Sequence, residues 1–345
     1  LTNKLKQTFK VGIIGCGNIG GQYDEKDTGG NVYTHAGMYH QRKEFNLVCA
    51  ADTNVERLKQ FGRYWNVERL YKDCVELFKK ETLDIISIAT PDETHHKLIL
   101  EALQYNPPQL VFTEKPLSIN LQQSIDIYEQ CKKKNIKLIV DYVRRWDENH
   151  QSVKKFLQDG KLGSVQTVLS YYVRGLRHNG CQMINLIQFL FGSIKSVQAV
   201  GATDLGTFKE DTSQDLRLIL EDGTPVYMIA LDQKGYGYSI FEMDIIGQDG
   251  RLRLLDGGQR FQLNKVTADP QFSNFNKLSK TGSPWEKSTY GKAMTRAGEE
   301  ISSFLKGQSS VLENTVEKAI DDLCVIEAAL ESARNNNIQT VVKRI

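Results

Sequence analysis

The chain has 345 residues, more than a single hydrophobic core usually serves, and this length favours two domains. Lysine plus arginine number 44 and aspartate plus glutamate number 42, so the net charge of +2 lacks the basic excess of a dedicated nucleic-acid binder. The longest charge-free apolar stretch, residues 183–194, is shorter than the roughly 20 residues that a membrane span needs. We therefore expect neither nucleic acid nor a membrane as a partner.

The six cysteines are scattered along the chain, without the paired spacing of a zinc site or a disulfide framework. The lysines among residues 1–10 are not followed by the apolar region of a secretory signal peptide. Both observations favour a cytoplasmic protein with free thiols, and we expect no metal site.

Short apolar runs alternate with amphipathic stretches over the first 145 residues. The runs are β-branched and nearly continuous in apolar character, as strands buried on both faces tend to be. The alternation predicts an α/β domain with a doubly wound parallel sheet, and helices over 54–64 and 94–105. The expected strands are 10–15, 46–51, 85–89, 110–113 and 137–141.

The pattern changes after about residue 160, where strands follow one another with few helices between them. Asp222-Gly223 and Asp249-Gly250 are typical of tight hairpin turns, so the second sheet is expected to be large, open and mostly antiparallel. The polar but aromatic-containing segment 272–290 is expected to form a long loop. The expected strands are 165–173, 196–203, 214–221, 226–233, 238–247, 251–255 and 260–267.

These patterns divide the chain at residue 145. Residues 1–145 would form the α/β domain and residues 146–345 an α+β domain. Apolar positions at helical spacing predict a helix over 313–335, which we expect to return toward the first domain.

Gly15-Cys-Gly17-Asn-Ile-Gly20 directly follows the first strand. Such glycines let backbone N–H groups approach a pyrophosphate at a helix N-terminus. The second strand ends at Asp52, whose carboxylate would bind the adenosine ribose and repel a 2′-phosphate, so we expect NAD(H) in preference to NADP(H). A polar insert at about 24–32 explains why Asp52 lies further from the glycines than usual. The alternative is that Asp52 only caps a helix.

Three further segments carry a family resemblance: Thr90-Pro91-Asp92-Glu93-Thr94-His95, Glu114-Lys115-Pro116, and His178-Asn-Gly180-Cys-Gln182-Met-Ile-Asn185. With the glycine motif they resemble the Gfo/Idh/MocA oxidoreductases over nearly the whole chain. The resemblance implies an NAD-binding Rossmann domain over residues 1–145. It implies a domain for substrate binding and oligomerisation, with an open antiparallel sheet, over residues 146–345. It also implies a substrate with a secondary alcohol or carbonyl, in a sugar, nucleotide sugar or cyclitol, and a homodimer or homotetramer joined through that sheet.

The resemblance implies that Lys115 is catalytic. At the carboxyl end of a parallel strand, a lysine points into the crevice where ligands bind, and it could bond the reacting oxygen and help to move its proton. The alternative is a surface lysine paired with Glu114. The cofactor-binding residues expected from the motifs are Gly15, Gly17, Asn18, Ile19, Gly20, Asp52, Thr90, Pro91, His95, Glu114 and Lys115.

The second domain departs from the family pattern Asp-x-Gly-x-His-x-x-Asp. His178 stands at the first Asp position, Gln182 at the His position and Asn185 at the last Asp position, and glutamine cannot titrate. Three interpretations follow. Lys115 handles the proton alone while Gln182 and Asn185 orient the substrate, or His178 takes over as acid and base. In the third, redox chemistry is lost and ligand binding kept. An NAD-assisted reaction without net redox is a further option.

Two arginines are candidates for binding an anionic substrate. Arg145 lies at the end of the fifth strand and Arg177 directly before His178. A guanidinium binds carboxylate or phosphate with two parallel hydrogen bonds. The alternatives are a domain-junction salt bridge for Arg145 and a solvated charge for Arg177.

Overall fold

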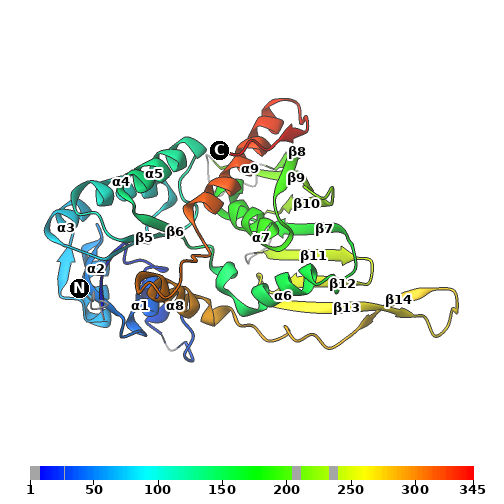
Figure 1. Cartoon of the computed structure of the whole chain (residues 1–345), viewed down its shortest axis with the longest axis horizontal. Coiled ribbons are helices and arrows are strands. Elements are labelled where there is room, and N and C mark those ends of the chain that lie inside the picture. The colour runs from blue at the N-terminus through cyan, green and yellow to red at the C-terminus, as the bar shows by residue number, and fades with distance from the viewer. Residues whose placement is uncertain (1–7, 27, 204–210, 233–239) are drawn as a thin grey trace. The chain divides into compact units, whose positions relative to one another are not determined.

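The computed structural model describes residues 8–26, 28–203, 211–232 and 240–345 (Figure 1). They form two compact units: unit 1 contains the chain up to Asp147 together with residues 291–320, and unit 2 contains residues 148–290 and 321–345. The first boundary lies close to the expected one, but residues 291–320 belong to unit 1. The reason is helix α8 (Ala293–Leu305), whose apolar residues are buried in the core of that unit.

Unit 1 is built on a six-stranded parallel sheet with the order β3-β2-β1-β4-β5-β6. The predicted doubly wound sheet is confirmed. The short edge strand β3 was not expected, because its three residues are partly or fully exposed and carry no apolar run. The strands are β1 (Phe9–Ile14), β2 (Phe45–Ala51), β3 (Arg69–Tyr71), β4 (Ile85–Ile88), β5 (Leu110–Thr113) and β6 (Lys137–Val140).

The order of the strands reverses between β1 and β4, which are direct neighbours. In open parallel sheets, ligands bind at the carboxyl ends of the strands where this reversal occurs. Residues of α1, α2 and α8 share one buried cluster with the sheet, while α3, α4 and α5 contact one another in turn. The helices are α1 (His35–His40), α2 (Val55–Trp65), α3 (Cys74–Lys80), α4 (His95–Tyr105) and α5 (Leu121–Lys134).

Unit 2 contains a nine-stranded sheet with the order β14-β13-β12-β11-β7-β10-β9-β8-β15. Its strands pair antiparallel except β7 and β10, so the expected mostly antiparallel sheet is confirmed. The strands are β7 (Val165–Tyr172), β8 (Ile194–Thr203), β9 (Ser213–Leu220), β10 (Pro225–Ala230), β11 (Phe241–Gly247), β12 (Gly250–Leu255), β13 (Arg260–Ala268), β14 (Asn276–Lys280) and β15 (Thr340–Val341).

Buried positions alternate with partly exposed ones along β9 and β11, as in a sheet with one packed face. The helices of unit 2 are α6 (Glu148–Gln158) and α7 (Cys181–Phe191), and α9 (Val316–Arg334) begins in unit 1 and continues in unit 2. The ends of two predicted strands, at residues 233 and 238–239, lie outside the described residues. No helix in the described ranges is long and apolar enough to cross a bilayer.

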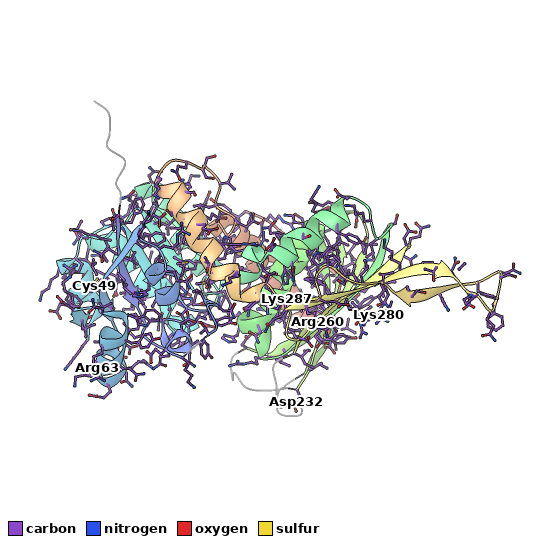
Figure 2. The ribbon with its side chains drawn as sticks, turned by 90° about the horizontal axis from the view of Figure 1, so that it is seen from below. Cys49, Arg63, Asp232, Arg260, Lys280 and Lys287 are labelled. Atoms are coloured by element: carbon purple, nitrogen blue, oxygen red, sulfur yellow. The ribbon has the colours of Figure 1, made fainter. Side chains whose placement is uncertain are left out.

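The segment expected as one long loop contains strand β14, which pairs with β13 to form a hairpin that projects beyond the neighbouring strands (Figure 1). Figure 2 labels Lys280 at the end of β14. None of the five residues of β14 is buried, so it has no alternation of buried and exposed side chains. This absence is why the segment was predicted as a loop.

We expect the Cys49 thiol to resist alkylation in the folded protein. Cys49 lies inside unit 1, whereas Arg63 lies at its surface (Figure 2). Burial raises the pKa of Cys49 from 9.0 to about 12, which lowers the thiolate fraction roughly a thousandfold, and only the thiolate reacts. Peptide mass spectrometry after iodoacetamide treatment at pH 8 should find Cys49 labelled in guanidinium but not in buffer. Equal labelling in both would contradict the burial.

Candidate functional site

The glycine turn follows β1, one of the two strands between which the strand order reverses. Gly15 has φ of +94°, and a Cβ there would lie 2.3 Å from the carbonyl oxygen of Ala89. A Cβ on Gly20 would lie 2.1 Å from the carbonyl oxygen of Gly15. A Cβ on Gly17 would meet no atom of the described residues within 4 Å. The turn itself therefore needs Gly15 and Gly20, whereas Gly17 leaves open space for a ligand.

The polar insert lies between the glycine turn and α1. The backbone N–H groups of His35 and Ala36 donate to the carbonyl oxygens of Ile19 and Gly20 at 3.1 and 3.0 Å. The backbone hydrogen bonds of α1 therefore continue onto the glycine turn, with the insert looped out between them. The carboxylate of Asp24 closes the loop by accepting the N–H groups of the two residues that precede α1.

Asp52 follows β2 and holds the glycine turn in place. Its Oδ2 accepts the backbone N–H of Cys16 at 2.8 Å, and its Oδ1 accepts that of Asn54 at 2.8 Å. The guanidinium of Arg57, on α2, binds both oxygens, with Nε and one terminal nitrogen each at 2.8 Å. The N-cap of α2 is Asn54, whose side chain accepts the N–H of Arg57. The alternative in which Asp52 only caps this helix is therefore wrong.

The Asp52 carboxyl is ionised at neutral pH. Burial raises its pKa, but the hydrogen bonds from Arg57, Asn54 and Cys16 outweigh burial and hold the pKa below its ordinary value. The open space at Gly17 and a carboxylate after the neighbouring strand are the features that a dinucleotide requires. The residues present therefore fit such a cofactor.

Thr90 and Pro91 form the turn after β4. The Thr90 hydroxyl lies 2.6 Å from that of Thr94. His95 is fully buried, with Nδ1 2.7 Å from the carbonyl oxygen of Pro116 and Nε2 2.9 Å from that of Thr90. Both ring nitrogens face backbone carbonyls. His95 thus links the turn after β4 to the loop after β5, and neither ring nitrogen is left to bind a cofactor.

Glu114 and Lys115 follow β5, and the Lys115–Pro116 peptide bond is cis. Glu114 Oε2 accepts the backbone N–H of Lys115 at 3.2 Å, and Oε1 lies 3.3 Å from Nε2 of His35. Asp141, which follows β6, brings Oδ2 to 3.6 Å from the same nitrogen. Three residues distant in sequence therefore meet at the carboxyl ends of β5 and β6. We call them the His35 cluster: His35, Glu114 and Asp141.

The residues of the His35 cluster shift one another's pKa values. Burial alone lowers the pKa of His35, but its hydrogen bonds with Asp141 and Glu114 raise it to about 9. Burial and the charge of Glu114 raise the pKa of Asp141 to about 6. Burial also raises the pKa of Glu114, but the hydrogen bond and charge of His35 outweigh it and lower that pKa. The two carboxyl groups thus favour the protonated form of His35.

His178 and Gln182 lie in unit 2, where a wide helical turn over Gly175–Gly180 runs into α7. The carboxylate of Asp211 accepts the N–H groups of Arg177 and His178, both at 2.8 Å, and fixes the start of this turn. Gln182 Nε2 donates to the side-chain oxygen of Asn179 at 3.1 Å. Sequence reasoning missed Asp211, because no local pattern links it to the turn.

Asn185 is buried on α7 and donates to Asp322 Oδ2 at 2.6 Å. Gln188 Nε2 donates to Oδ1 of the same carboxylate at 2.9 Å. Asp322 lies on α9 and is itself fully buried. A carboxylate therefore lies beside the position where the family pattern has its last aspartate, but a distant helix supplies it. Its distance of 137 positions from Asn185 explains why sequence patterns did not reveal it.

The two candidate arginines both form ion pairs. Arg145 is buried in unit 1 with one terminal nitrogen 3.1 Å from Glu313 Oε1. In unit 2, a terminal nitrogen of Arg177 lies 3.9 Å from Glu327 Oε1. Glu313 was not singled out from the sequence, and it gives Arg145 a structural role within unit 1.

A family model described as "Oxidoreductase family, NAD-binding Rossmann fold" (GFO_IDH_MocA) matches residues 9–142. The match runs from the first residue of β1 to just beyond β6, and so contains the glycine turn, Asp52 and the Glu114-Lys115 pair. Residues 9–142 belong to the Gfo/Idh/MocA oxidoreductases. The family resemblance inferred from the motifs is therefore confirmed.

The chain is similar in sequence to two dehydrogenases and in fold to a third. The chain is 28% identical to a myo-inositol 2-dehydrogenase of Thermotoga maritima over 45% of this chain and 42% of that enzyme. It is 26% identical to the scyllo-inositol 2-dehydrogenase (NAD(+)) of Bacillus subtilis over 72% and 74%. The fold matches the WlbA dehydrogenase of Bordetella pertussis, solved with NADH and UDP-GlcNAcA, at a TM-score of 0.78, 18% identity, and 98% and 99% coverage.

Proposed function

We propose that this chain is an NAD-dependent oxidoreductase that acts on a secondary alcohol or carbonyl of a sugar, nucleotide sugar or cyclitol. The observation that carries the proposal is the glycine turn braced by Asp52, in a Gfo/Idh/MocA chain. Relatives named as inositol dehydrogenases support the substrate class. A WlbA complex that holds UDP-GlcNAcA supports including nucleotide sugars.

When bound, the nicotinamide cofactor supplies hydride transfer, and the chain supplies binding and orientation. Gly15, Gly17 and Gly20, with Asn18 and Ile19 between them, would hold the pyrophosphate. Asp52 would bind the hydroxyls of the adenosine ribose. Thr90, Pro91, His95, Glu114 and Lys115 would form the nicotinamide side, with His95 supporting the Thr90 turn through its carbonyl contacts.

Lys115 would contact the reacting oxygen of the substrate and relay its proton. Its ammonium group can donate hydrogen bonds to a developing alkoxide, and it lies at the carboxyl end of β5, where ligands bind in parallel sheets. The neighbouring Glu114 turns to His35 and to the backbone of Lys115, so it helps to fix the loop that carries the lysine.

The residues of unit 2 would orient the substrate. Gln182 can donate and accept hydrogen bonds with hydroxyl groups, and His178 is the candidate for a second acid or base. Asn185 would act through its bond to Asp322, and Arg177 would bind an anionic group. Arg145 is the weakest of the candidate substrate ligands, because Glu313 already binds it.

The test follows nicotinamide absorbance with purified protein, NAD and a panel of sugars, nucleotide sugars and cyclitols. NADH formation with any member supports the proposal and names the substrate class. NAD binding without turnover on the whole panel would count against a dehydrogenase. It would favour the second candidate, a protein that binds NAD and a sugar without net redox. That candidate is favoured by the pairing of Gln182 with Asn179, which puts an amide where the family has a titratable histidine.

We further propose that NAD(H) is preferred over NADP(H) and that Asp52 sets this preference. In Asp52→Asn the repulsive charge is lost and Arg57 is released to bind a 2′-phosphate. Hydrogen bonds to charged groups contribute about 1.5–3 kcal/mol, so the ratio of NADPH to NADH affinity should rise at least about tenfold. Fluorescence titrations with both cofactors measure this ratio.

The double variant Asp52→Asn/Arg57→Gln is the matched control for this experiment. It should bind NADPH less tightly than Asp52→Asn alone, because it lacks the Arg57 guanidinium, which donates two hydrogen bonds to the Asp52 carboxylate in the wild type. An unchanged affinity ratio in Asp52→Asn would refute the proposed role of Asp52 in selecting the cofactor.

A homodimer or homotetramer, joined through the sheet of unit 2, remains our proposal for the assembly, and a cytoplasmic location our proposal for the compartment. Partly exposed residues alternate along β9 and β11, which gives the sheet a second, less buried face. Light scattering measures the assembly directly.

A further inference from the structure

We propose that His35, Glu114 and Asp141 bind one divalent transition-metal ion, such as Zn²⁺, inside unit 1. Each residue presents one ligand atom, and these three atoms all lie within 4.8 Å of one another. An imidazole nitrogen with two carboxylate oxygens is a donor set for zinc and similar ions. The sequence predicted no metal site, and metal binding by these residues does not depend on the oxidoreductase activity.

The spacing in the His35 cluster matches a tetrahedral metal site better than direct hydrogen bonds. Ligands bound at about 2.0–2.2 Å in a tetrahedron lie about 3.3–3.6 Å apart. His35 Nε2 lies 3.3 Å from the Glu114 oxygen and 3.6 Å from the Asp141 oxygen. A strong charge-assisted hydrogen bond is shorter, at about 2.7–2.9 Å, so both contacts of His35 Nε2 are longer than such a bond.

The other ring nitrogen of His35 is already bound. Nδ1 lies 2.6 Å from the hydroxyl oxygen of Ser87, which also accepts from the hydroxyl of Tyr39 at 3.3 Å. The ring of Phe112 stacks on the imidazole, with centroids 4.5 Å apart and planes 19° apart. Metal-binding histidines typically donate their second N–H to such a partner, which fixes the ring and directs the free nitrogen at the metal.

Asp141 provides a second, independent observation. Its Oδ1 is buried and has no hydrogen-bond partner among the described residues, and its side chain is only 4% exposed. A buried carboxylate oxygen without a partner is costly, whereas a metal ion accepts a carboxylate through one oxygen or both. The Glu114 side chain is 12% exposed, compared with 0% for His35, so an ion would enter on the side of Glu114.

Three elements supply the ligands: the start of α1 and the carboxyl ends of β5 and β6. Three protein ligands leave a fourth position of the tetrahedron for water or another small ligand. The nitrogen donor favours Zn²⁺ over Mg²⁺, which prefers six oxygen ligands. The competing occupant is a single proton on His35 Nε2, which the experiment distinguishes.

The experiment uses the full chain, stripped with a chelator and then dialysed against ZnCl₂. We expect one zinc per chain by elemental analysis, and saturable Zn²⁺ binding by calorimetry that excess Mg²⁺ does not compete away. Co²⁺ in place of Zn²⁺ should give the intense visible bands of a four-coordinate site. Ser87→Ala should weaken Zn²⁺ binding by about 10- to 100-fold, since it removes the partner that orients His35.

Asp141→Asn removes one ligand and should weaken Zn²⁺ binding more than Ser87→Ala does. Asp84→Asn is the matched control, because Asp84 is also buried in unit 1 but bonds Gln109 and the backbone of Lys10 instead. It should bind Zn²⁺ as the wild type does, and circular dichroism checks that each variant is folded. Absence of stoichiometric zinc in the wild type, or equal binding by folded Asp141→Asn, would overturn the proposal and leave a proton as the occupant.

Discussion

Lys115→Ala is expected to lower the turnover of the most active substrate in the panel by about 10²–10⁴-fold, the usual contribution of a positioned acid or base. NADH affinity should stay within a few-fold, because the glycine turn and Asp52, which would hold the adenosine half, are untouched. Turnover is measured by nicotinamide absorbance and affinity by NADH fluorescence. A large loss of turnover with little change in NADH affinity distinguishes a catalytic lysine from one that only binds the cofactor.

Lys97→Ala provides the matched control for this prediction. Lys97 is a surface lysine on α4, and its Nζ lies 3.8 Å from Glu101 Oε1. Its removal should therefore leave turnover unchanged. Lys115→Arg keeps the charge but changes the geometry and should remain slow, since a guanidinium does not give up its proton. Retained activity in Lys115→Ala would refute the role assigned to this residue and transfer it to His178.

Gly17→Ala and Gly20→Ala are expected to fail in different ways. A Cβ at position 17 enters open space, so the protein should fold with an unchanged melting temperature. That Cβ would occupy the space that the pyrophosphate needs. The loss of a hydrogen bond to a charged group costs about 1.5–3 kcal/mol, so NADH affinity should fall about 10- to 100-fold.

Gly20→Ala should instead destabilise unit 1. Its Cβ would lie 2.1 Å from the Gly15 carbonyl oxygen, a separation that requires the backbone to move. Thermal unfolding followed by circular dichroism should show a lower melting temperature than in Gly17→Ala. If Gly17→Ala binds NADH as tightly as the wild type, the pyrophosphate does not lie against the glycine turn.

Elements with a buried face could be predicted from the sequence, and elements without one could not. All four residues of β4 and of β5 are buried, and each strand is apolar except for one hydroxyl residue, Ser87 in β4 and Thr113 in β5. The edge strand β14 has no buried residue, and its pairing with β13 depends on backbone hydrogen bonds, which leave no pattern in the side chains.

The same limit applies to the candidate site. Asp52 could be predicted because a strand end and a glycine turn are both local patterns. The pair of hydrogen bonds from Arg57 to Asp52 could not be predicted, because a separation of five residues does not determine whether two side chains point toward each other. Asp322 and Asp141 meet their partners only through the packing of separate elements, and a single sequence contains no signal for such contacts.

The looped-out insert has a consequence for the spacing of the dinucleotide motif. An N–H group in an α-helix donates to the carbonyl four residues earlier, so His35, which donates to Ile19, occupies the place of residue 23. The chain is therefore twelve residues longer than a continuous helix would be, and the polar insert at about 24–32 accounts for most of them. Asp52 follows Gly20 by 32 residues, and without these twelve the separation is 20, which is the ordinary value of about 20 residues. In three dimensions the motif has its standard length, and a search at fixed spacing would overlook chains lengthened in this way.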